Sequence, residues 1–260
     1  MDLDTRSKHL FFLKGYLIFF GLLNISCTYK LDKLYPHESA FIKGQVQWQS
    51  NLYFPRIETF KQSPIGFNKI VFLGNSITEG GGDWSKRFKT KNLINRGISG
   101  DFTSGVLARL DEVTYFQPTA IFLLIGLNDI FGINDPLISS DYVFRQINKI
   151  ANIINTKSPK TELYIQTILP VDEKKYLKVK GSYPMHNKPL PEKIIDINNK
   201  LLNSSQKNYS VINLYKHFIN DDNDVKGFLF RDGVHLNEKG YELWTKILKK
   251  YIYQFEKKVT

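Results

Sequence analysis

Short apolar runs alternate with amphipathic stretches from residue 69 to the end of the chain. Each run is short and rich in branched or aromatic side chains, which is typical of a buried strand. The five predicted strands span residues 69–73, 92–95, 120–125, 163–168 and 211–214, and the second is the weakest.

Apolar residues between these runs recur at helical spacing. Val106, Leu110 and Val113 lie at positions i, i+4 and i+7, and similar stripes begin at Val143, Ile194 and Tyr241. Continuous apolar strands separated by amphipathic helices indicate a parallel sheet covered on both faces. We therefore predict an α/β fold over residues 67–260, a three-layer α/β/α sandwich with a five-stranded parallel sheet.

The N-terminal residues have a different pattern. Residues 1–14 carry Arg6, Lys8 and Lys14, and residues 15–25 carry no charge. A helix of that length rises only about 16 Å, roughly half of a bilayer core, so it is too short to span. The pattern predicts a signal peptide over residues 1–26.

Ser26 and Cys27, the single cysteine of the chain, follow the apolar run. A small residue before a lone cysteine resembles a bacterial lipoprotein processing site, although Asn24 stands where that family usually has Leu. The resemblance implies lipid attachment at Cys27 and an extracytoplasmic protein anchored to a bacterial membrane, in the periplasm or at the cell surface. Plain secretion, a retained N-terminal helix and an ordinary thiol are the alternatives. Residues 27–66 are expected to form a tether and an N-terminal extension that packs on the domain.

Composition narrows the class of protein. The chain is 42% hydrophobic and 23% charged, which excludes a disordered or low-complexity protein. Its net charge of +11 suits nucleic acid, an anionic membrane or an acidic substrate. No basic helix carries interleaved aromatic residues, so no nucleic-acid partner is expected.

Candidate chemistry lies in the loops that follow the predicted strands, where ligands of such sheets bind. Ser76, in the segment Gly74-Asn75-Ser76, opens a helix just past the first strand. It is a candidate nucleophile whose backbone N–H would face a developing oxyanion. The alternative is a helix N-cap serine.

The last loop contains Asp232 three residues before His235. A turn at this spacing lets the carboxylate hold the imidazole Nδ1–H and leaves Nε2 free as a base. Gly100 follows the second strand and Asn128 the third, and their backbone and amide N–H groups can donate to an oxyanion. Each feature alone is more often structural, but four such loops at one sheet edge point to acyl transfer.

These segments resemble the SGNH (GDSL-type) hydrolases. Gly74-Asn75-Ser76, Gly100, Gly126-x-Asn128-Asp129 and Asp232-x-x-His235 match their motif blocks I, II, III and V in order, over roughly residues 68–254. Asn75 departs from the aspartate in the family name. The segments NRGISGDFTSGVLARL and LLIGLND are similar to the platelet-activating-factor acetylhydrolase-like branch, which includes sialate O-acetylesterases.

The resemblance implies a flavodoxin-like SGNH fold and a role for each matched residue. Ser76 would be the nucleophile, His235 the general base and acid, and Asp232 its orienting carboxylate. The oxyanion hole would comprise the N–H groups of Ser76 and Gly100 and the Asn128 side chain. No metal or cofactor is expected, and no zinc-binding HExxH motif occurs.

The expected substrate is a small-molecule or glycan ester. We expect removal of short acyl groups, such as acetyl, from an O-acylated carbohydrate, with sialic acid as a candidate because residues 171–193 are rich in lysine. A merely solvated basic loop is the alternative explanation of those lysines. A lipid-directed esterase or lysophospholipase and a non-catalytic carbohydrate-binding lipoprotein are the alternative functions.

Overall fold

The structure is a computed structural model that describes residues 31–131, 138–182, 189–204 and 208–256. The predicted leader, residues 1–26, and Cys27 lie outside the described residues. Within the described ranges, no helix combines the length and the apolar character needed to cross a membrane.

Five parallel strands form one sheet, as predicted. Their order is β2-β1-β3-β4-β5. β1 and β3 are therefore neighbours, β2 lies on the outer side of β1, and β4 and β5 follow on the outer side of β3. The strands are β1 (Ile70–Gly74), β2 (Leu93–Gly97), β3 (Ala120–Leu124), β4 (Glu162–Gln166) and β5 (Ser210–Ile212). Every residue of β1 and β3 is buried, which explains their continuous apolar sequences.

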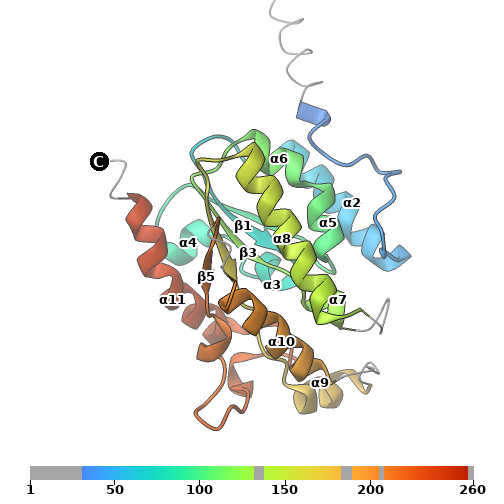
Figure 1. Ribbon diagram of the computed structural model, residues 1–260, viewed down its shortest axis with the longest axis vertical. Helices are drawn as coiled ribbons and strands as arrows, with labels where there is room; N and C mark the ends of the chain where they lie inside the picture. The colour runs from blue at the N-terminus through green and yellow to red at the C-terminus, as the bar shows by residue number, and fades with distance from the viewer. Residues whose placement is uncertain (1–30, 132–137, 183–188, 205–207, 257–260) are drawn as a thin grey trace, which may run out of the picture.

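Helices cover both faces of the sheet (Figure 1). One layer contains α8, which packs beside α5, α6 and α10, and the other contains α4 and α11, which pack on each other. The helices are α2 (Gln47–Gln62), α3 (Ser76–Glu79), α4 (Trp84–Phe88), α5 (Thr103–Ala108), α6 (Leu110–Tyr115), α7 (Leu127–Ile130), α8 (Ser140–Lys157), α9 (Glu173–Lys180), α10 (Leu190–Leu202) and α11 (Glu238–Glu256), with the 3₁₀ turns η1 (Tyr215–His217) and η2 (Gly227–Leu229). The predicted α/β/α sandwich is therefore confirmed.

Aromatic side chains in register join the central strands. Phe72, Phe122 and Tyr164 are cross-strand neighbours, and their rings stack with centroids 5.3 and 4.8 Å apart. The Trp84 indole stacks on Phe72 at 4.1 Å and meets Trp244 of α11 edge-on at 4.9 Å. This aromatic core fixes the strands whose carboxyl ends carry the candidate site.

Some elements differ from the sequence-based expectation. Residues 173–180, expected to belong to a basic loop, form α9. The expected single helix around Val106–Val113 is divided at Arg109. The φ of −119° and ψ of 19° at Arg109 depart from helical values. Residues 47–62, expected to belong to a tether and extension, form α2, whose buried Tyr53, Ile57 and Phe60 lie at i, i+4 and i+7. Polar neighbours and Pro55 inside the helix obscure that stripe in the sequence.

The N-terminal segment belongs to the folded body. Tyr35, Ile42 and the buried face of α2 form a second apolar cluster with Ile98 and Phe102, which follow β2. The extension is thereby attached to the loop that contains Gly100, at the carboxyl edge of the sheet.

Candidate active site

The structure brings Ser76, His235 and Asp232 together in one hydrogen-bonded chain. Ser76 Oγ lies 3.0 Å from His235 Nε2, although the two residues are 159 positions apart in the sequence. His235 Nδ1 lies 2.9 Å from Asp232 Oδ2. A hydroxyl, an imidazole and a carboxylate in this order are the arrangement that activates a serine nucleophile.

Asn75, and not Ser76, caps the short helix α3. The Asn75 side-chain oxygen accepts a hydrogen bond from the Ile77 N–H at 3.0 Å, and Ser76 is the first helical residue. The serine hydroxyl is therefore available to His235. Asn75 supplies the same acceptor that an aspartate would supply at this position, so its departure from the family name leaves the turn intact.

Asp232 holds both the imidazole and the backbone of its own turn. Its Oδ1 accepts hydrogen bonds from the N–H groups of His235 at 2.8 Å and Val234 at 3.1 Å. Gly233, between Asp232 and Val234, has φ +91°, a conformation that favours glycine. Burial acts to raise the pKa of Asp232, but the hydrogen bonds from His235 outweigh it and the pKa lies below its usual value. Asp232 is thus an anion that can stabilise an imidazolium.

Three candidate hydrogen-bond donors come from separate loops. Within the described part of the chain, no hydrogen bond engages the backbone N–H of Ser76 or Gly100. The Asn128 side-chain amide donates to the Asp101 carbonyl at 2.7 Å, which fixes its plane and leaves a second amide hydrogen. Donors of this kind stabilise a tetrahedral oxyanion, so the predicted oxyanion hole stays a prediction.

Helix α2 anchors the loop that carries Gly100. Gln49 is buried, and its Nε2 donates to the Gly100 carbonyl at 3.0 Å. Glu79 accepts hydrogen bonds from the N–H and hydroxyl of Ser99 at 2.7 and 2.5 Å, and Arg56 of α2 lies 3.3 Å from the same carboxylate. Sequence analysis missed Gln49, because no motif marks a residue that acts through a distant loop.

Arg109, also missed, connects the ends of β1 and β2. Its guanidinium forms a buried pair with Asp101 at 2.8 Å and donates to the carbonyls of Arg96 and Gly74 at 2.9 and 3.0 Å. Its position at the break between α5 and α6 explains the interruption of the predicted helix. The buried guanidinium keeps the first two candidate loops at a fixed separation.

The lysines of residues 171–193 differ in environment: Lys174, Lys178 and Lys180 are exposed, whereas others bond to the protein. Lys175 Nζ donates to the carbonyls of Gly227 and Phe230 at 3.0 and 2.7 Å. Lys193 is buried and donates to Ile138 O, and Lys188 lies outside the described residues. Tyr176 lies close to the turn that contains Asp232 and His235. A Cβ atom added at Gly233 in this turn would lie 2.7 Å from the Tyr176 backbone nitrogen.

No group of three or more His, Cys, Asp or Glu side chains suited to a metal ion occurs among the described residues. The expectation that the reaction needs no cofactor stays a prediction.

Comparison with known proteins places this arrangement in a family. The model of the GDSL-like lipase/acylhydrolase family matches residues 72–243. The α2 subunit of human platelet-activating factor acetylhydrolase IB is 25% identical over 226 residues, which cover 84% of this chain and 89% of that protein.

Two solved structures share the fold. A Streptococcus pneumoniae protein described as a platelet activating factor has 28% identity and a TM-score of 0.67, covering 79% of this chain and 95% of its own. A GDSL-like lipase of Bacteroides thetaiotaomicron has 25% identity and a TM-score of 0.60, covering 72% and 88%. The chain belongs to the GDSL-like lipase/acylhydrolase family, and it is a carboxylic ester hydrolase.

Proposed function

We propose that this protein is a serine esterase that removes short acyl groups, such as acetyl, from an O-acylated carbohydrate. The observation that carries the proposal is the continuous chain from Asp232 through His235 to Ser76, with contacts of 2.9 and 3.0 Å. The three candidate oxyanion donors come from loops at the same carboxyl edge of the sheet.

The chemistry proceeds through an acyl-enzyme on Ser76. His235 Nε2 takes the Ser76 hydroxyl proton as Oγ attacks the ester carbonyl carbon, while anionic Asp232 stabilises the imidazolium. The N–H groups of Ser76 and Gly100 and the Asn128 amide donate to the oxyanion of the tetrahedral intermediate. His235 then protonates the leaving alcohol.

Hydrolysis of the acyl-enzyme repeats the same proton transfers. His235 takes a proton from water, the hydroxide attacks the acyl carbon, and the carboxylic acid leaves as Ser76 recovers its proton. The named side chains account for every proton and bond in this cycle, so the proposal includes no cofactor.

A cavity next to Asn128, lined by both polar and apolar side chains, supports a carbohydrate substrate. The cavity has a volume of about 570 Å³, and its lining includes Lys43, Gln45, Ser104 and Arg145. Hydroxyl-rich ligands need polar partners of this kind. Trp48, 45% exposed, lies beside Gly100 and offers a flat apolar face for a sugar ring.

The same cavity supports an anionic sugar such as sialic acid. Lys43 and Arg145 are exposed, and neither has a carboxylate partner among the residues that the structure describes. The carboxylate of sialic acid would give both cations a counter-charge, as the lysine-rich loop was expected to do.

A lipid-directed esterase is the second candidate, and the names of the relatives favour it. One relative is an acetylhydrolase of platelet-activating factor and another a GDSL-like lipase. Both candidates share the acyl-transfer chemistry and differ in the ester, because a lipid-directed esterase or lysophospholipase would also accept long acyl chains. A non-catalytic carbohydrate-binding protein would not need the contact between Ser76 and His235.

The test is hydrolysis of p-nitrophenyl esters of increasing chain length by residues 28–260. We expect activity to decline sharply beyond about four acyl carbons, because a short-acyl site excludes longer chains sterically. Ser76→Ala should lower kcat by about 10³-fold or more, and Asn128→Ala by about 10²–10³-fold. Full activity on long acyl chains would favour the lipid candidate, and near-normal activity of Ser76→Ala would refute the nucleophile.

The sugar is tested by comparing O-acetylated sialic acid with neutral acetylated xylan. We expect a preference for the sialic acid that falls about tenfold when Lys43 and Arg145 are both replaced by Gln. Lys149→Gln, on the exposed side of the same helix α8, is the control. Equal rates on both substrates in the wild type would remove the charge argument.

We also propose that the protein is exported and lipid-anchored through Cys27. Cys27→Ser should move the protein from the membrane fraction to the soluble fraction of the cells that express it. An unchanged membrane fraction would exclude this cysteine as the anchor.

A further inference from the structure

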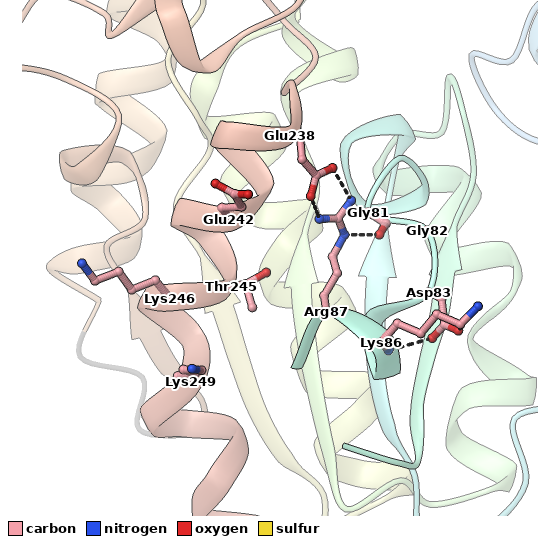
Figure 2. Close-up of a pocket in the computed structure, with 10 residues that line it drawn as sticks. All are labelled: Gly81, Gly82, Asp83, Lys86, Arg87, Glu238, Glu242, Thr245, Lys246 and Lys249. Carbon is pink, nitrogen blue, oxygen red and sulfur yellow. Dashed lines mark hydrogen bonds and ion pairs between the residues drawn. The ribbon is translucent and has the colours of Figure 1, made fainter. Parts of the chain in front are cut away.

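The segments that carry Ser76 and His235 are far apart in the sequence, and Arg87 of α4 connects them. Its Nε donates to the Gly81 carbonyl at 2.5 Å, and its two terminal nitrogens donate to the Glu238 carboxylate at 2.6 and 3.0 Å. Gly81 follows the helix that Ser76 opens, and Glu238 begins α11 shortly after His235. Figure 2 shows Arg87 between the two segments, with dashed contacts to both.

Tyr241 forms a second link beneath this one. Its hydroxyl donates to the Ile77 carbonyl at 2.9 Å, directly after Ser76 in the chain. The Arg87 guanidinium lies 4.7 Å from the centre of the Tyr241 ring. Arg87 therefore contacts three groups that each belong to one of the two catalytic segments.

We propose that Arg87 is a positioning residue that sets the distance between Ser76 and His235. The inference rests on the proposed function of these two residues. A guanidinium forms a planar fork, so its paired bonds to a carboxylate fix an angle as well as a distance. A displacement of about 1 Å between reacting groups can lower a rate by up to about 10²-fold.

The same pair adds little to the stability of the fold. Glu238 is 66% exposed at its side chain and Arg87 19% exposed. Both line an open cavity of about 770 Å³ between α4 and α11, so ions reach the pair. Exposed ion pairs stabilise proteins weakly and are screened by salt. Position and stability can therefore be separated by experiment.

The experiment compares Arg87→Met and Arg87→Lys with the wild type on p-nitrophenyl acetate, a neutral ester. We expect kcat to fall about tenfold in Arg87→Met with KM within about twofold, because only alignment changes. Arg87→Lys keeps the charge but loses the fork, so it should resemble Arg87→Met. Lys86→Met is the matched control, because Lys86 lines the same cavity, is 87% exposed and, among the residues with described positions, forms an ion pair with Asp83 alone, at 3.6 Å.

Salt provides a readout that a purely structural role would not change. Wild-type kcat should fall about threefold between 0.05 and 1 M NaCl, as the ion pair is screened. Glu238→Gln and Arg87→Met should show no such decline, and Lys86→Met should keep it. The rate at which a fluorophosphonate labels Ser76 should follow the same order, since it depends on the same alignment.

The outcomes separate this inference from the proposed function. A wild type that neither hydrolyses the ester nor labels Ser76 would overturn both. An active wild type with unchanged kcat in Arg87→Met would overturn the positioning role alone. The positioning role would also be overturned if Lys86→Met lost as much kcat as Arg87→Met. It would be overturned as well if the kcat loss in Arg87→Met were explained by a lowered melting temperature of that variant.

Discussion

The buried pair between Arg109 and Asp101 gives the sharpest stability prediction. Replacing Arg109 with Met removes both contacts to Asp101, at 2.8 and 3.0 Å. The fully buried Asp101 carboxylate then lacks the guanidinium that balances its charge. Breaking a buried ion pair from one side costs about 3–5 kcal/mol. In a domain of this size that loss corresponds to a melting temperature about 6–20 °C lower.

The loss should depend on pH in a defined direction. Burial raises the pKa of Asp101 to about 6 although Arg109 acts to lower it, so removal of Arg109 raises the pKa further. Between pH 6 and the new pKa the wild-type carboxyl ionises while that of the variant stays protonated. The destabilisation should therefore grow by about 1.4 kcal/mol per pH unit above pH 6 and level off below it.

Thermal unfolding followed by circular dichroism at pH 5, 6, 7 and 8 measures both effects. Lys157→Met is the control, because it breaks an exposed pair with Asp111 whose side chains are 55% and 59% exposed. That change should cost about 0–1 kcal/mol. Adding Asp101→Asn to Arg109→Met removes the buried charge and should restore part of the stability. An Arg109→Met variant as stable as Lys157→Met, or a loss independent of pH, would refute the reasoning.

Three further predictions concern the loops around the site. Gln49→Ala should lower kcat about tenfold with KM unchanged, because the Gly100 carbonyl loses its hydrogen bond to Gln49. Gln47→Ala, on the exposed side of α2, should leave kcat intact. Equal kcat values in the two variants would argue against a role of Gln49 in holding the Gly100 loop. Burial raises the pKa of Asp129 to about 7, so its contribution to stability is complete below about pH 4 and lost as the pH rises through 7. Between pH 6 and 8 the melting temperature of the wild type should fall by more than that of Asp129→Asn, and parallel curves would contradict the assignment. Asp232→Asn should lower kcat by less than the loss of about 10³-fold in Ser76→Ala, because Asn keeps an oxygen that accepts a hydrogen bond from the His235 backbone N–H. A kcat loss larger than that of Ser76→Ala, measured across a pH–rate profile, would show that the carboxylate charge is essential.

The periodicity of apolar residues in the sequence predicts the sheet and the long helices. β1 and β3 are buried on both faces, so their sequences had to be continuous in apolar residues, and α8 follows its apolar stripe from Val143 to Ile154. The elements that sequence analysis missed are those whose signal is weak or interrupted. Helix α2 has a helical stripe, but Pro55 lies within it.

For the candidate site, the sequence by itself predicted which residues form it and in which order they occur. Ser76, Asp232 and His235 were predicted from their positions after strands and from their match to the SGNH motif blocks, and residue types are local information. Only the tertiary structure decided which side chains bond to the segments around those groups: Gln49 to the Gly100 carbonyl, Arg109 to the Gly74 carbonyl and Arg87 to the Gly81 carbonyl. Their bonds run to backbone carbonyls and to carboxylates brought near by the fold. A bond to a carbonyl depends on where the chain lies and not on which side chain it carries, so no pattern of residues along the sequence can predict it.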